Sequence, residues 1–322
     1  MRTVLPYASV LCTGAEGFVG QRLVRILRQS LPEQARLTLA AHHLPDGAGS
    51  EWLALDITDA SSVRAAMESA RPDLVVHLAA QSSVGATARA GPAAWAVNHL
   101  GSFNIAAAIG AVAPQACLFF PSSAEVYGRT FNREVATEAS DLRPMSIYAR
   151  TKAAAEAMLA DVLPDTARLI VTRPSNHSGP GQDSRFVLPA FAEQIARIEA
   201  GLAPPVVRVG NLDAERDFLH LEDVLEAYLA LLAAEKLPAR ATFNIASGTV
   251  VRIGDLLDRL VALSRVPVSI ERDPARARPS DIARAALSAD ALRSTIGWAP
   301  SRDIDTIVAD VLADQRARIP EA

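Results

Sequence analysis

Three side chains in this sequence form a set that can move a proton at an alcohol or carbonyl oxygen. Tyr148 and Lys152 are four residues apart, so a helix places both on one face. A tyrosine phenol ordinarily titrates near pH 10, about three units too high for easy proton transfer at neutral pH, and a nearby ammonium group lowers that pKa. The Ser123 hydroxyl, in a polar turn after an apolar run, suits holding a substrate oxygen beside the phenol. We therefore expect acid–base chemistry at a sugar or alcohol oxygen.

A glycine triplet near the start of the chain predicts a dinucleotide site beside this chemistry. Gly14, Gly17 and Gly20 follow an apolar run and precede an amphipathic segment, which is typical of a buried strand, a tight turn and a helix. Gly14 can take the unusual backbone angles of the turn, Gly17 lets the backbone approach an anion, and Gly20 lets the helix pack closely on the sheet. The N–H groups at the helix start suit a pyrophosphate. A nicotinamide cofactor bound there would exchange a hydride with the substrate carbon.

The end of the second predicted strand leaves the choice between NAD(H) and NADP(H) open. Many dinucleotide folds have an acidic residue at this point, which holds the adenosine ribose. Here residues 37–41 are followed by His42 and His43, so there is neither an acid to favour NAD nor an arginine to favour NADP. Either histidine could touch a 2′-phosphate, although an exposed loop histidine is the commoner case. Asp56 could bind the adenine amino group or cap a helix, a role that suits Asp59 better.

Strand-like and helix-like segments alternate up to residue 175, which predicts an α/β fold with a Rossmann-like, doubly wound parallel sheet. Beyond this point the rhythm breaks. We expect a dinucleotide-binding domain of residues 1–175 plus 217–247 and a smaller, discontinuous C-terminal substrate lobe of residues 176–216 plus 248–322. The strands are expected near residues 10–13, 37–41, 52–55, 74–80, 117–120, 169–172, 206–209, 241–246 and 266–270, and long helices near residues 18–29, 95–111, 187–199, 221–236, 253–264 and 304–316.

Composition narrows the class of protein. Of the 322 residues 50% are hydrophobic and 21% are charged, and the net charge of −4 argues against nucleic acid as a partner. No apolar run reaches the roughly 18 residues of a membrane span, and the first residues lack the apolar block of a signal peptide. Cys12 and Cys117 lie in apolar runs, so we expect buried free thiols. His77, within another apolar run, is expected in the core. We expect a cytoplasmic protein without a metal site.

Taken together, these motifs resemble the extended short-chain dehydrogenases/reductases, the NAD-dependent epimerase/dehydratase family that acts on nucleotide sugars. The resemblance covers nearly the whole chain. Its motifs are Thr-Gly-Ala-Glu-Gly-Phe-Val-Gly at residues 13–20, Asp56, His-Leu-Ala-Ala at 77–80, Asn98, Ser-Ser-Ala-Glu-Val-Tyr-Gly at 122–128, the Tyr148/Lys152 pair, Arg-Asp-Phe at 216–218 and Arg-Pro at 278–279.

The resemblance also implies roles for individual residues and a homodimer that pairs the helices containing Trp95 and Tyr148. Arg216 and Arg278 would bind the nucleotide diphosphate, for which a forked guanidinium is well suited. The implied catalytic residues are Ser123, Tyr148, Lys152 and Glu125. The implied ligands of NADP(H) or NAD(H) are Gly14, Gly17, Phe18, Val19, Asp56, Ile57, Leu78, Ala79, Ala80, Asn98, Tyr148, Lys152 and Pro174. The implied ligands of the nucleotide sugar are Ser82, Ser123, Asn176, Val187, Arg216 and Arg278.

Within the family, residues 142–146, 176–182 and 210–217 resemble the branch that acts on GDP-linked mannose derivatives. The most similar members are GDP-6-deoxy-4-keto-D-mannose reductases. This implies NAD(P)H-dependent reduction of the C4 ketone of GDP-4-keto-6-deoxy-D-mannose to GDP-D-rhamnose. Two alternatives stay open: a GDP-mannose 4,6-dehydratase, in which a carboxylate at Glu125 is the base at C5, and a nucleotide-sugar 4-epimerase, in which the Ser123–Ala124 pair is common. Either would keep its nicotinamide tightly bound.

Overall fold

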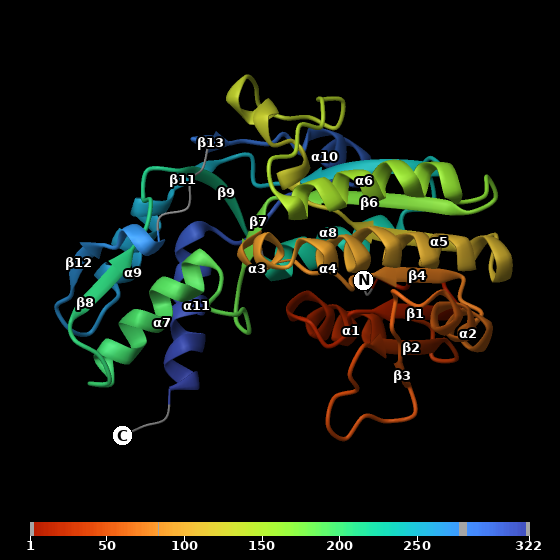
Figure 1. Ribbon diagram of the computed structural model, residues 1–322, viewed down its shortest axis with the longest axis horizontal. Coiled ribbons are helices and arrows are strands. Elements are labelled where there is room, and N and C mark those ends of the chain that lie inside the picture. Colours follow the sequence, from red (N-terminus) through yellow and green to blue (C-terminus); the bar gives the residue numbers. More distant parts are fainter. Residues whose placement is uncertain (1–2, 83, 277–281, 320–322) are drawn as a thin grey trace.

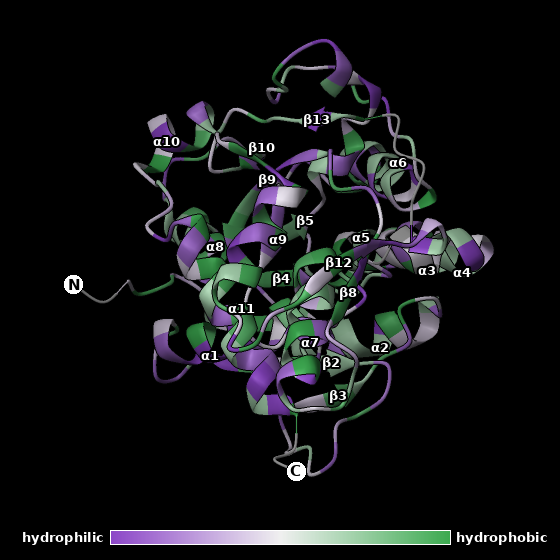
Figure 2. Cartoon of the chain, turned by 90° about the vertical axis from the view of Figure 1, so that its left-hand side faces the viewer, coloured by the Kyte–Doolittle hydropathy of each residue, from purple (hydrophilic) through white to green (hydrophobic). Residues whose placement is uncertain are grey.

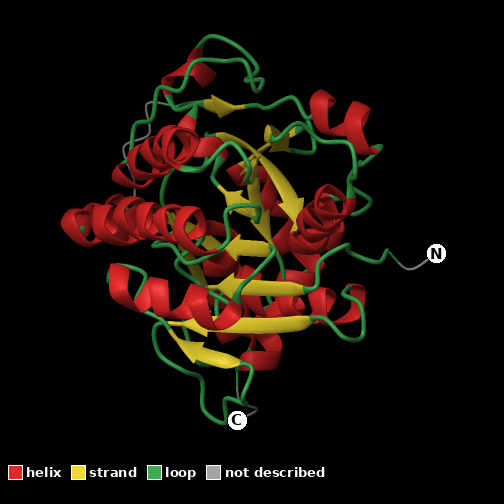
Figure 3. Ribbon diagram, turned by 90° about the vertical axis from the view of Figure 1, so that its right-hand side faces the viewer, coloured by secondary structure: helices red, strands yellow, loops and turns green. Residues whose placement is uncertain are grey.

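The computed structural model describes residues 3–82, 84–276 and 282–319. Its centre is a seven-stranded parallel sheet with the strand order β10-β6-β5-β4-β1-β2-β3 (Figures 1 and 3). The order reverses at β1, which lies between β2 and β4, so the predicted doubly wound sheet is confirmed. The strands of this sheet are Ser9–Thr13 (β1), Arg36–Ala41 (β2), Trp52–Ala54 (β3), Leu74–His77 (β4), Cys117–Pro121 (β5), Arg168–Pro174 (β6) and Arg240–Ile245 (β10).

Alternate residues of each central strand enter different cores, one on each face of the sheet. In β4, Leu74 and Val76 join the core that includes α1 and α8, whereas Val75 joins the core that includes α2, α5 and α6. Because both faces are covered, β4 and β5 are apolar along almost their whole length, and Figure 2 shows hydrophobic strands inside hydrophilic outer segments. The covering helices are Phe18–Ser30 (α1), Ala60–Ala70 (α2), Gly101–Val112 (α5), Ile147–Val162 (α6) and Leu221–Ala233 (α8).

A third core lies at the left of Figure 1. It is built from two stretches of the chain, one that follows β6 and one that follows β10. It consists of apolar side chains from three helices and the strand β8, which pairs with β12. Its elements are Val187–Glu199 (α7), Val206–Val209 (β8), Ile253–Ala262 (α9), Ser269–Arg272 (β12) and Ile304–Arg318 (α11). A small separate sheet contains Asn176–Ser178 (β7), Glu215–His220 (β9), Val250–Arg252 (β11) and Arg284–Ala285 (β13).

The structure differs from the sequence expectations at short, polar or irregular segments. The strand expected at residues 266–270 is wrong in position, because β12 is Ser269–Arg272 and all four of its residues are exposed. The helix expected at residues 95–111 begins earlier, as Gly91–Trp95 (α4), and passes through the π-helical turn Ala96–Leu100 before α5. The periodicity of the sequence signals neither the exposed strand β12 nor the π-helical turn. The four strands of the small sheet, with charged and polar residues at their ends, were not predicted either.

His77 belongs to the core, as predicted, and joins the end of β1 to α5. Ser102 donates its proton to the carbonyl of Asn98 at 2.7 Å, so its oxygen accepts from His77 Nε2 at 3.2 Å. His77 Nδ1 is then the acceptor for the Thr13 hydroxyl at 2.8 Å, and Thr13 Oγ1 also accepts from the Ala79 N–H at 3.2 Å. Burial, and to a lesser degree the Lys152 ammonium, lowers the pKa of His77 to about 3. The imidazole therefore stays neutral.

Three further sequence expectations about single residues are confirmed. Cys12 and Cys117 are both buried and free. Burial raises the pKa of the Cys12 thiol to about 12, so this thiol is inert at neutral pH. Asp59 caps α2, because its carboxylate accepts a hydrogen bond from the Ser61 N–H at 2.8 Å.

The tight packing of α1 on the glycine turn predicts that Gly20→Ala destabilises the fold. A Cβ atom at residue 20 would overlap the Gly14 carbonyl oxygen and lie 2.8 Å from Ala15 Cα, so the backbone would have to shift. Such overpacking costs about 1–3 kcal/mol in the free energy of unfolding, which urea denaturation measures. Gly110→Ala in α5 is the matched control, since its Cβ would meet only Pro164 Cδ at 3.7 Å. Equal loss in both variants would contradict the prediction.

Candidate active site

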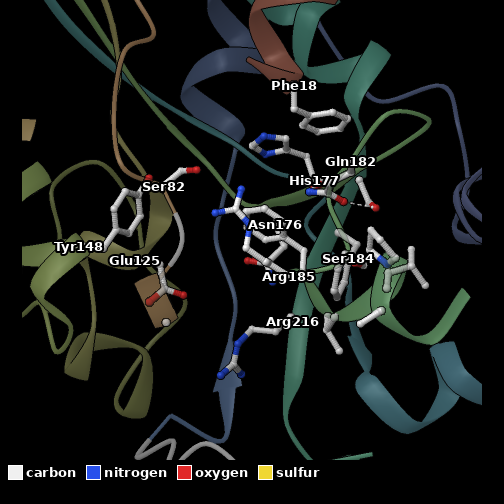
Figure 4. Close-up of a pocket in the computed structure, with 18 of the residues that line it drawn as sticks. Phe18, Ser82, Glu125, Tyr148, Asn176, His177, Gln182, Ser184, Arg185 and Arg216 are labelled. Carbon is white, nitrogen blue, oxygen red and sulfur yellow. Dashed lines mark hydrogen bonds between the residues drawn. The ribbon is translucent and has the colours of Figure 1, made fainter. Parts of the chain in front are cut away.

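A cavity of about 860 Å³ lies where the carboxyl ends of the parallel strands face the third core. Open α/β sheets bind their ligands at this edge. In Figure 4, Ser82, Glu125 and Tyr148 lie on one side of the cavity, and residues of the small sheet and the segment before α7 lie on the other. The sequence-predicted site residues that line it are Gly14, Gly17, Phe18, Val19, Leu78, Ala80, Ser82, Ser123, Glu125, Tyr148, Pro174, Asn176, Val187 and Arg216.

The glycine turn fits a pyrophosphate. Gly14 has φ +67°, and a Cβ there would lie 2.6 Å from the Ala79 nitrogen, so only glycine suits this position. Gly17, the N-cap of α1, provides no side-chain cap, which leaves the first N–H groups of the helix for a ligand. A Cβ at Gly17 would meet just one neighbouring atom, the Gly14 carbonyl oxygen at 3.3 Å, because this side of the turn opens into the cavity. The residues present therefore form a cradle for a dinucleotide.

Ser123 and Tyr148 meet at the carboxyl end of β5. Ser123 caps the short helix Ala124–Val126 and accepts a hydrogen bond from the Glu125 N–H at 3.2 Å. Tyr148 is the second residue of α6, whose cap Ser146 accepts from the Ala149 N–H at 3.0 Å. The Tyr148 side chain is 9% exposed, and burial raises its pKa to about 12, opposed by a hydrogen bond with Ser123. At neutral pH the phenol therefore keeps its proton and can donate it.

Lys152 lies behind Tyr148, buried and outside the cavity lining. Its Nζ donates to the Pro121 carbonyl at 2.7 Å and lies 4.5 Å from the centre of the Phe120 ring. Burial lowers the pKa of Lys152 to about 8, opposed by the Glu156 carboxylate. The pKa of Tyr148 is raised and not lowered as the sequence suggested, because burial of the phenol dominates, while the Lys152 ammonium is bonded to the end of β5.

A buried ion pair beneath the site was missed by the sequence reasoning. Arg173 Nη2 lies 2.6 Å from Glu156 Oε2, and both side chains are 8% exposed. Glu156 also accepts a hydrogen bond from Ser122 Oγ. Arg173 Nη1 donates to the Tyr127 hydroxyl at 2.9 Å, which donates to Asn244 Oδ1 at 2.7 Å. This network joins α6 to β5, β6 and β10. The one sequence signal is Glu156 four residues after Lys152, on the same helix face.

Glu125 and Arg216 carry opposite charges into the cavity from opposite sides (Figure 4). Burial raises the pKa of Glu125, and the Arg216 guanidinium opposes this. Arg216 Nη1 donates to the Glu215 carbonyl at 2.8 Å, and Nη2 donates to the Ile282 carbonyl at 3.1 Å. The guanidinium is thus held by backbone oxygens and faces the space where an anion would bind.

Several predicted ligands lie outside the cavity lining. Asp56 accepts hydrogen bonds from Thr58 at 2.9 Å (N) and 2.7 Å (Oγ1). Asn98 is buried, and its side-chain amide bonds both backbone groups of Gln81, at 2.8 and 3.2 Å. Ile57 packs against Gly101, and Ala79 lies directly behind Gly14. Arg278 lies outside the described residues.

Some polar residues of the cavity were not predicted as site residues. The His177 ring stacks on Phe18, with ring centroids 6.5 Å apart, and His177 Nδ1 lies 3.1 Å from the Ser175 carbonyl. Burial lowers the pKa of His177, with the Ser175 carbonyl opposing. Since His177 lies three residues after the end of β6, its place at the carboxyl edge of the sheet could have identified it. The others in the lining are Arg89, Ser122, Ser175, Ser178, Gln182, Ser184, Arg185, Arg208, Asn211 and Arg276.

Across residues 3–82, 84–276 and 282–319, no three histidine, cysteine, aspartate or glutamate side chains group closely enough to hold a metal ion. Every helix in these same ranges is too short or too polar to cross a lipid bilayer.

Comparison with known proteins places these features in context. Residues 10–246 match the family model described as "NAD dependent epimerase/dehydratase family". The chain is 33% identical to the GDP-6-deoxy-D-mannose reductase of Pseudomonas aeruginosa, over 96% of this chain and 97% of that protein. It is 27% identical to the GDP-6-deoxy-D-talose 4-dehydrogenase of Aggregatibacter actinomycetemcomitans, over 85% of this chain and 86% of that protein.

Two solved structures of similar proteins share the fold of this chain. The structure of RMD from Pseudomonas aeruginosa complexed with NADPH superposes with a TM-score of 0.79 at 30% identity, covering 97% of this chain and 100% of that one. The NAD complex of UDP-glucose 4-epimerase from Thermus thermophilus has a TM-score of 0.81 at 26% identity, covering 96% and 99% of the two chains.

The buried ion pair predicts that Arg173→Met strongly destabilises the protein. The variant leaves the Glu156 carboxylate buried without its partner, which costs about 3–5 kcal/mol in the free energy of unfolding. Arg143→Met is the matched control, because Arg143 pairs with Asp141 at the surface and such pairs contribute about 0–1 kcal/mol. Urea denaturation of both variants measures the difference. A similar, small effect of both would mean that the Glu156–Arg173 pair does not hold the fold together.

Proposed function

The chain belongs to the NAD dependent epimerase/dehydratase family, and from this premise we propose that it is an NAD(P)H-dependent nucleotide-sugar 4-ketoreductase. The substrate is a nucleotide-activated 4-keto-6-deoxyhexose, namely GDP-4-keto-6-deoxy-D-mannose, and the product is GDP-D-rhamnose. The observation that carries the proposal is that Ser123, Tyr148 and the glycine turn line one cavity at the carboxyl edge of the sheet. The similarity to a GDP-6-deoxy-D-mannose reductase over nearly the full length supports the choice of substrate.

The cofactor, NADP(H) or NAD(H), lies along the carboxyl edge of the sheet in this proposal. Gly14, Gly17, Phe18 and Val19 hold the pyrophosphate through the first N–H groups of α1. Asp56 and Ile57 lie at the adenine end, next to β3. The nicotinamide end is lined by Leu78, Ala80 and Pro174. Ala79 and Asn98 contribute indirectly, because Ala79 supports Gly14 and Asn98 holds the segment after β4.

In the proposed reaction, Tyr148 and Ser123 act on the oxygen of the C4 ketone. The Ser123 hydroxyl orients the carbonyl, and the Tyr148 phenol donates its proton to the oxygen as negative charge develops there. The bound nicotinamide supplies the hydride. Lys152 stabilises the phenolate that remains, and this support weakens as the pH rises through about 8, where Lys152 loses its proton. Closure of the site by the third core excludes water.

The diphosphate of the substrate is assigned to the opposite wall. Arg216 offers a forked guanidinium whose position is fixed by backbone carbonyls, a geometry suited to phosphate oxygens. Asn176, Val187 and Ser82 line the same cavity as Arg216 and Tyr148. Glu125 favours a second candidate function, a 4,6-dehydratase. Its carboxyl group lies in the same cavity, has a pKa raised by burial and could act as a base.

We also propose how the chain divides into domains, where the enzyme is located and how it associates. Residues 1–175 plus 217–247 form the dinucleotide domain, and residues 176–216 plus 248–322 form the nucleotide-sugar lobe. The protein is a cytoplasmic homodimer that pairs the helices containing Trp95 and Tyr148. Support comes from large apolar side chains exposed along α4 to α5, since Trp95, Leu100 and Phe103 are 41%, 44% and 40% accessible.

The assay that tests the function follows nicotinamide absorbance with purified protein and GDP-4-keto-6-deoxy-D-mannose, first with NADPH and then with NADH. We expect loss of reduced cofactor equal to the GDP-deoxyhexose formed. A dehydratase or epimerase regenerates its cofactor in each turnover, so it would show no net loss. In that case GDP-mannose with catalytic NAD(P)+ would give product, the protein would purify with bound nicotinamide, and the ketoreductase proposal would be wrong.

Tyr148→Phe is expected to abolish turnover and leave cofactor binding nearly intact. The variant keeps the ring that lines the cavity and removes only the proton donor, which typically contributes about 10²–10⁴-fold to the rate. Tyr7→Phe, which removes a buried phenolic hydroxyl away from the cavity, is the control and should retain activity. Rates come from nicotinamide absorbance and affinities from fluorescence titration with NADPH. Near-normal turnover by Tyr148→Phe would exclude the assigned role.

A further inference from the structure

The chain crosses between the proposed dinucleotide domain and the proposed nucleotide-sugar lobe at residues 175–176, 216–217 and 247–248. We propose that the Asp217 carboxylate holds these crossings together and thereby positions Arg216, the proposed diphosphate ligand, on the wall of the cavity. Asp217 is then a positioning residue that acts through Arg216. The inference rests on the proposed function in one respect, that Arg216 binds a nucleoside diphosphate. It goes further because it names the residue on which this binding geometry depends.

Each crossing contributes a group to one cluster of hydrogen bonds. Asp217 Oδ1 accepts from Ser175 Oγ at 2.8 Å and from the Ser247 N–H at 3.0 Å. Asp217 Oδ2 accepts from the Gly248 N–H at 2.8 Å. The first and last crossings are also bonded directly, since the Ser175 N–H donates to the Ile245 carbonyl at 2.8 Å. One carboxylate therefore joins segments that are far apart in the sequence.

The cluster is buried, so its hydrogen bonds cannot be exchanged freely for bonds to water. Asp217 is 2% exposed and Ser175 is 4% exposed. Burial raises the pKa of Asp217, and the hydrogen bonds from Ser247, Ser175 and Gly248 oppose this. Loss of one acceptor oxygen would leave a buried N–H or hydroxyl without its partner, which costs free energy unless the backbone moves. The crossings would then shift relative to one another.

Arg216 and Asp217 are neighbours in β9, so their side chains point to opposite faces of the strand. Arg216 lines the cavity, whereas Asp217 lies outside its lining. The backbone of both residues is paired with β11, in the register Arg216 to Val251 and Asp217 to Val250. Any movement of the backbone at Asp217 is therefore transmitted to the guanidinium of Arg216.

The strand β9 passes from one core to another immediately after this cluster. Phe218 contributes to the third core, and Leu219 contributes to the core that includes α1 and α8. Phe218 also pairs with Asn176 of β7, which follows the first crossing. Figure 4 shows Arg216 and Tyr148 in different walls of the cavity. The cluster thus lies where the wall that carries Arg216 is joined to the sheet that carries Tyr148.

The test measures GDP binding by titration calorimetry and NADPH binding by fluorescence titration, on the full-length protein and on Asp217→Asn. Asparagine keeps the shape of the side chain but replaces one acceptor oxygen with a donor group. We expect the affinity for GDP to fall about tenfold, the value of one charge-assisted hydrogen bond to the diphosphate, and the affinity for NADPH to change less than about twofold. With the sugar nucleotide, KM should rise accordingly and kcat should change less.

Two further variants separate positioning from stability. Asp73→Asn is the matched control, because the Asp73 carboxylate also accepts from backbone N–H groups, those of Ala8 and Ser9 at 2.7 and 3.0 Å, but within the dinucleotide domain. This variant should leave GDP affinity unchanged. In an Arg216→Gln background, Asp217→Asn should cause no further loss of GDP affinity, because the two residues act as one unit.

Three results overturn the inference: unchanged GDP affinity in Asp217→Asn, equal losses of GDP and NADPH affinity, or a full further loss in the Arg216→Gln background. If thermal denaturation shows that Asp217→Asn does not fold, Ser175→Ala, which removes a single donor to the carboxylate, takes its place with the same expected directions. The proposed function fails separately, and the inference with it, if the unaltered protein does not bind GDP or if Arg216→Gln binds GDP normally.

Discussion

The buried pair of Glu156 and Arg173 is the constraint on which the geometry of the site depends. Two charges removed from water are tolerated only when they are paired closely and their remaining hydrogen-bonding positions are filled, and here Ser122 and Tyr127 fill them. The pair lies one turn of α6 beyond Lys152 and immediately beneath the end of β5. Together with the hydrogen bond from Lys152 to the Pro121 carbonyl, it fixes the distance between β5, which ends just before Ser123, and α6, which contains Tyr148. Along the chain these two elements are joined by residues 122–146, which include two short helical turns.

Burial then determines the protonation states of Tyr148 and Lys152. Because the Tyr148 phenol lies in a desolvated pocket, its neutral form is favoured, which is the form required of a donor to a developing alkoxide. The same burial weakens the charged form of Lys152, and the Glu156 carboxylate partly restores it. One buried carboxylate thus serves both packing and proton chemistry. His77, which is also buried but has neutral partners on both ring nitrogens, stays uncharged and structural.

Sequence patterns predicted the central sheet and its carboxyl-edge site well, and failed where a contact is set by distant parts of the chain. The glycine triplet and the apolar runs are local signals, so β1, α1 and the doubly wound order followed from them. The Glu156–Arg173 pair joins residues 17 apart through the fold, and no local rule tells a buried glutamate from a solvated one. Likewise β12 lies at an exposed edge, where no apolar pattern marks its register.

The glycine turn connects the proposed dinucleotide site to the proposed catalytic side chains. On one side its backbone bonds the end of β2, just before His42; on the other side it packs on β4 through Thr13 and His77. The helix bonded to His77 carries Asn98, whose amide donates to Thr151 at 3.0 Å, and Thr151 donates to the Tyr148 carbonyl at 2.8 Å. A continuous set of hydrogen bonds thus relates the proposed dinucleotide site to Tyr148, the proposed proton donor. Since hydride and proton must reach adjacent atoms of one carbonyl group, this shared framework fixes the two transfers relative to each other.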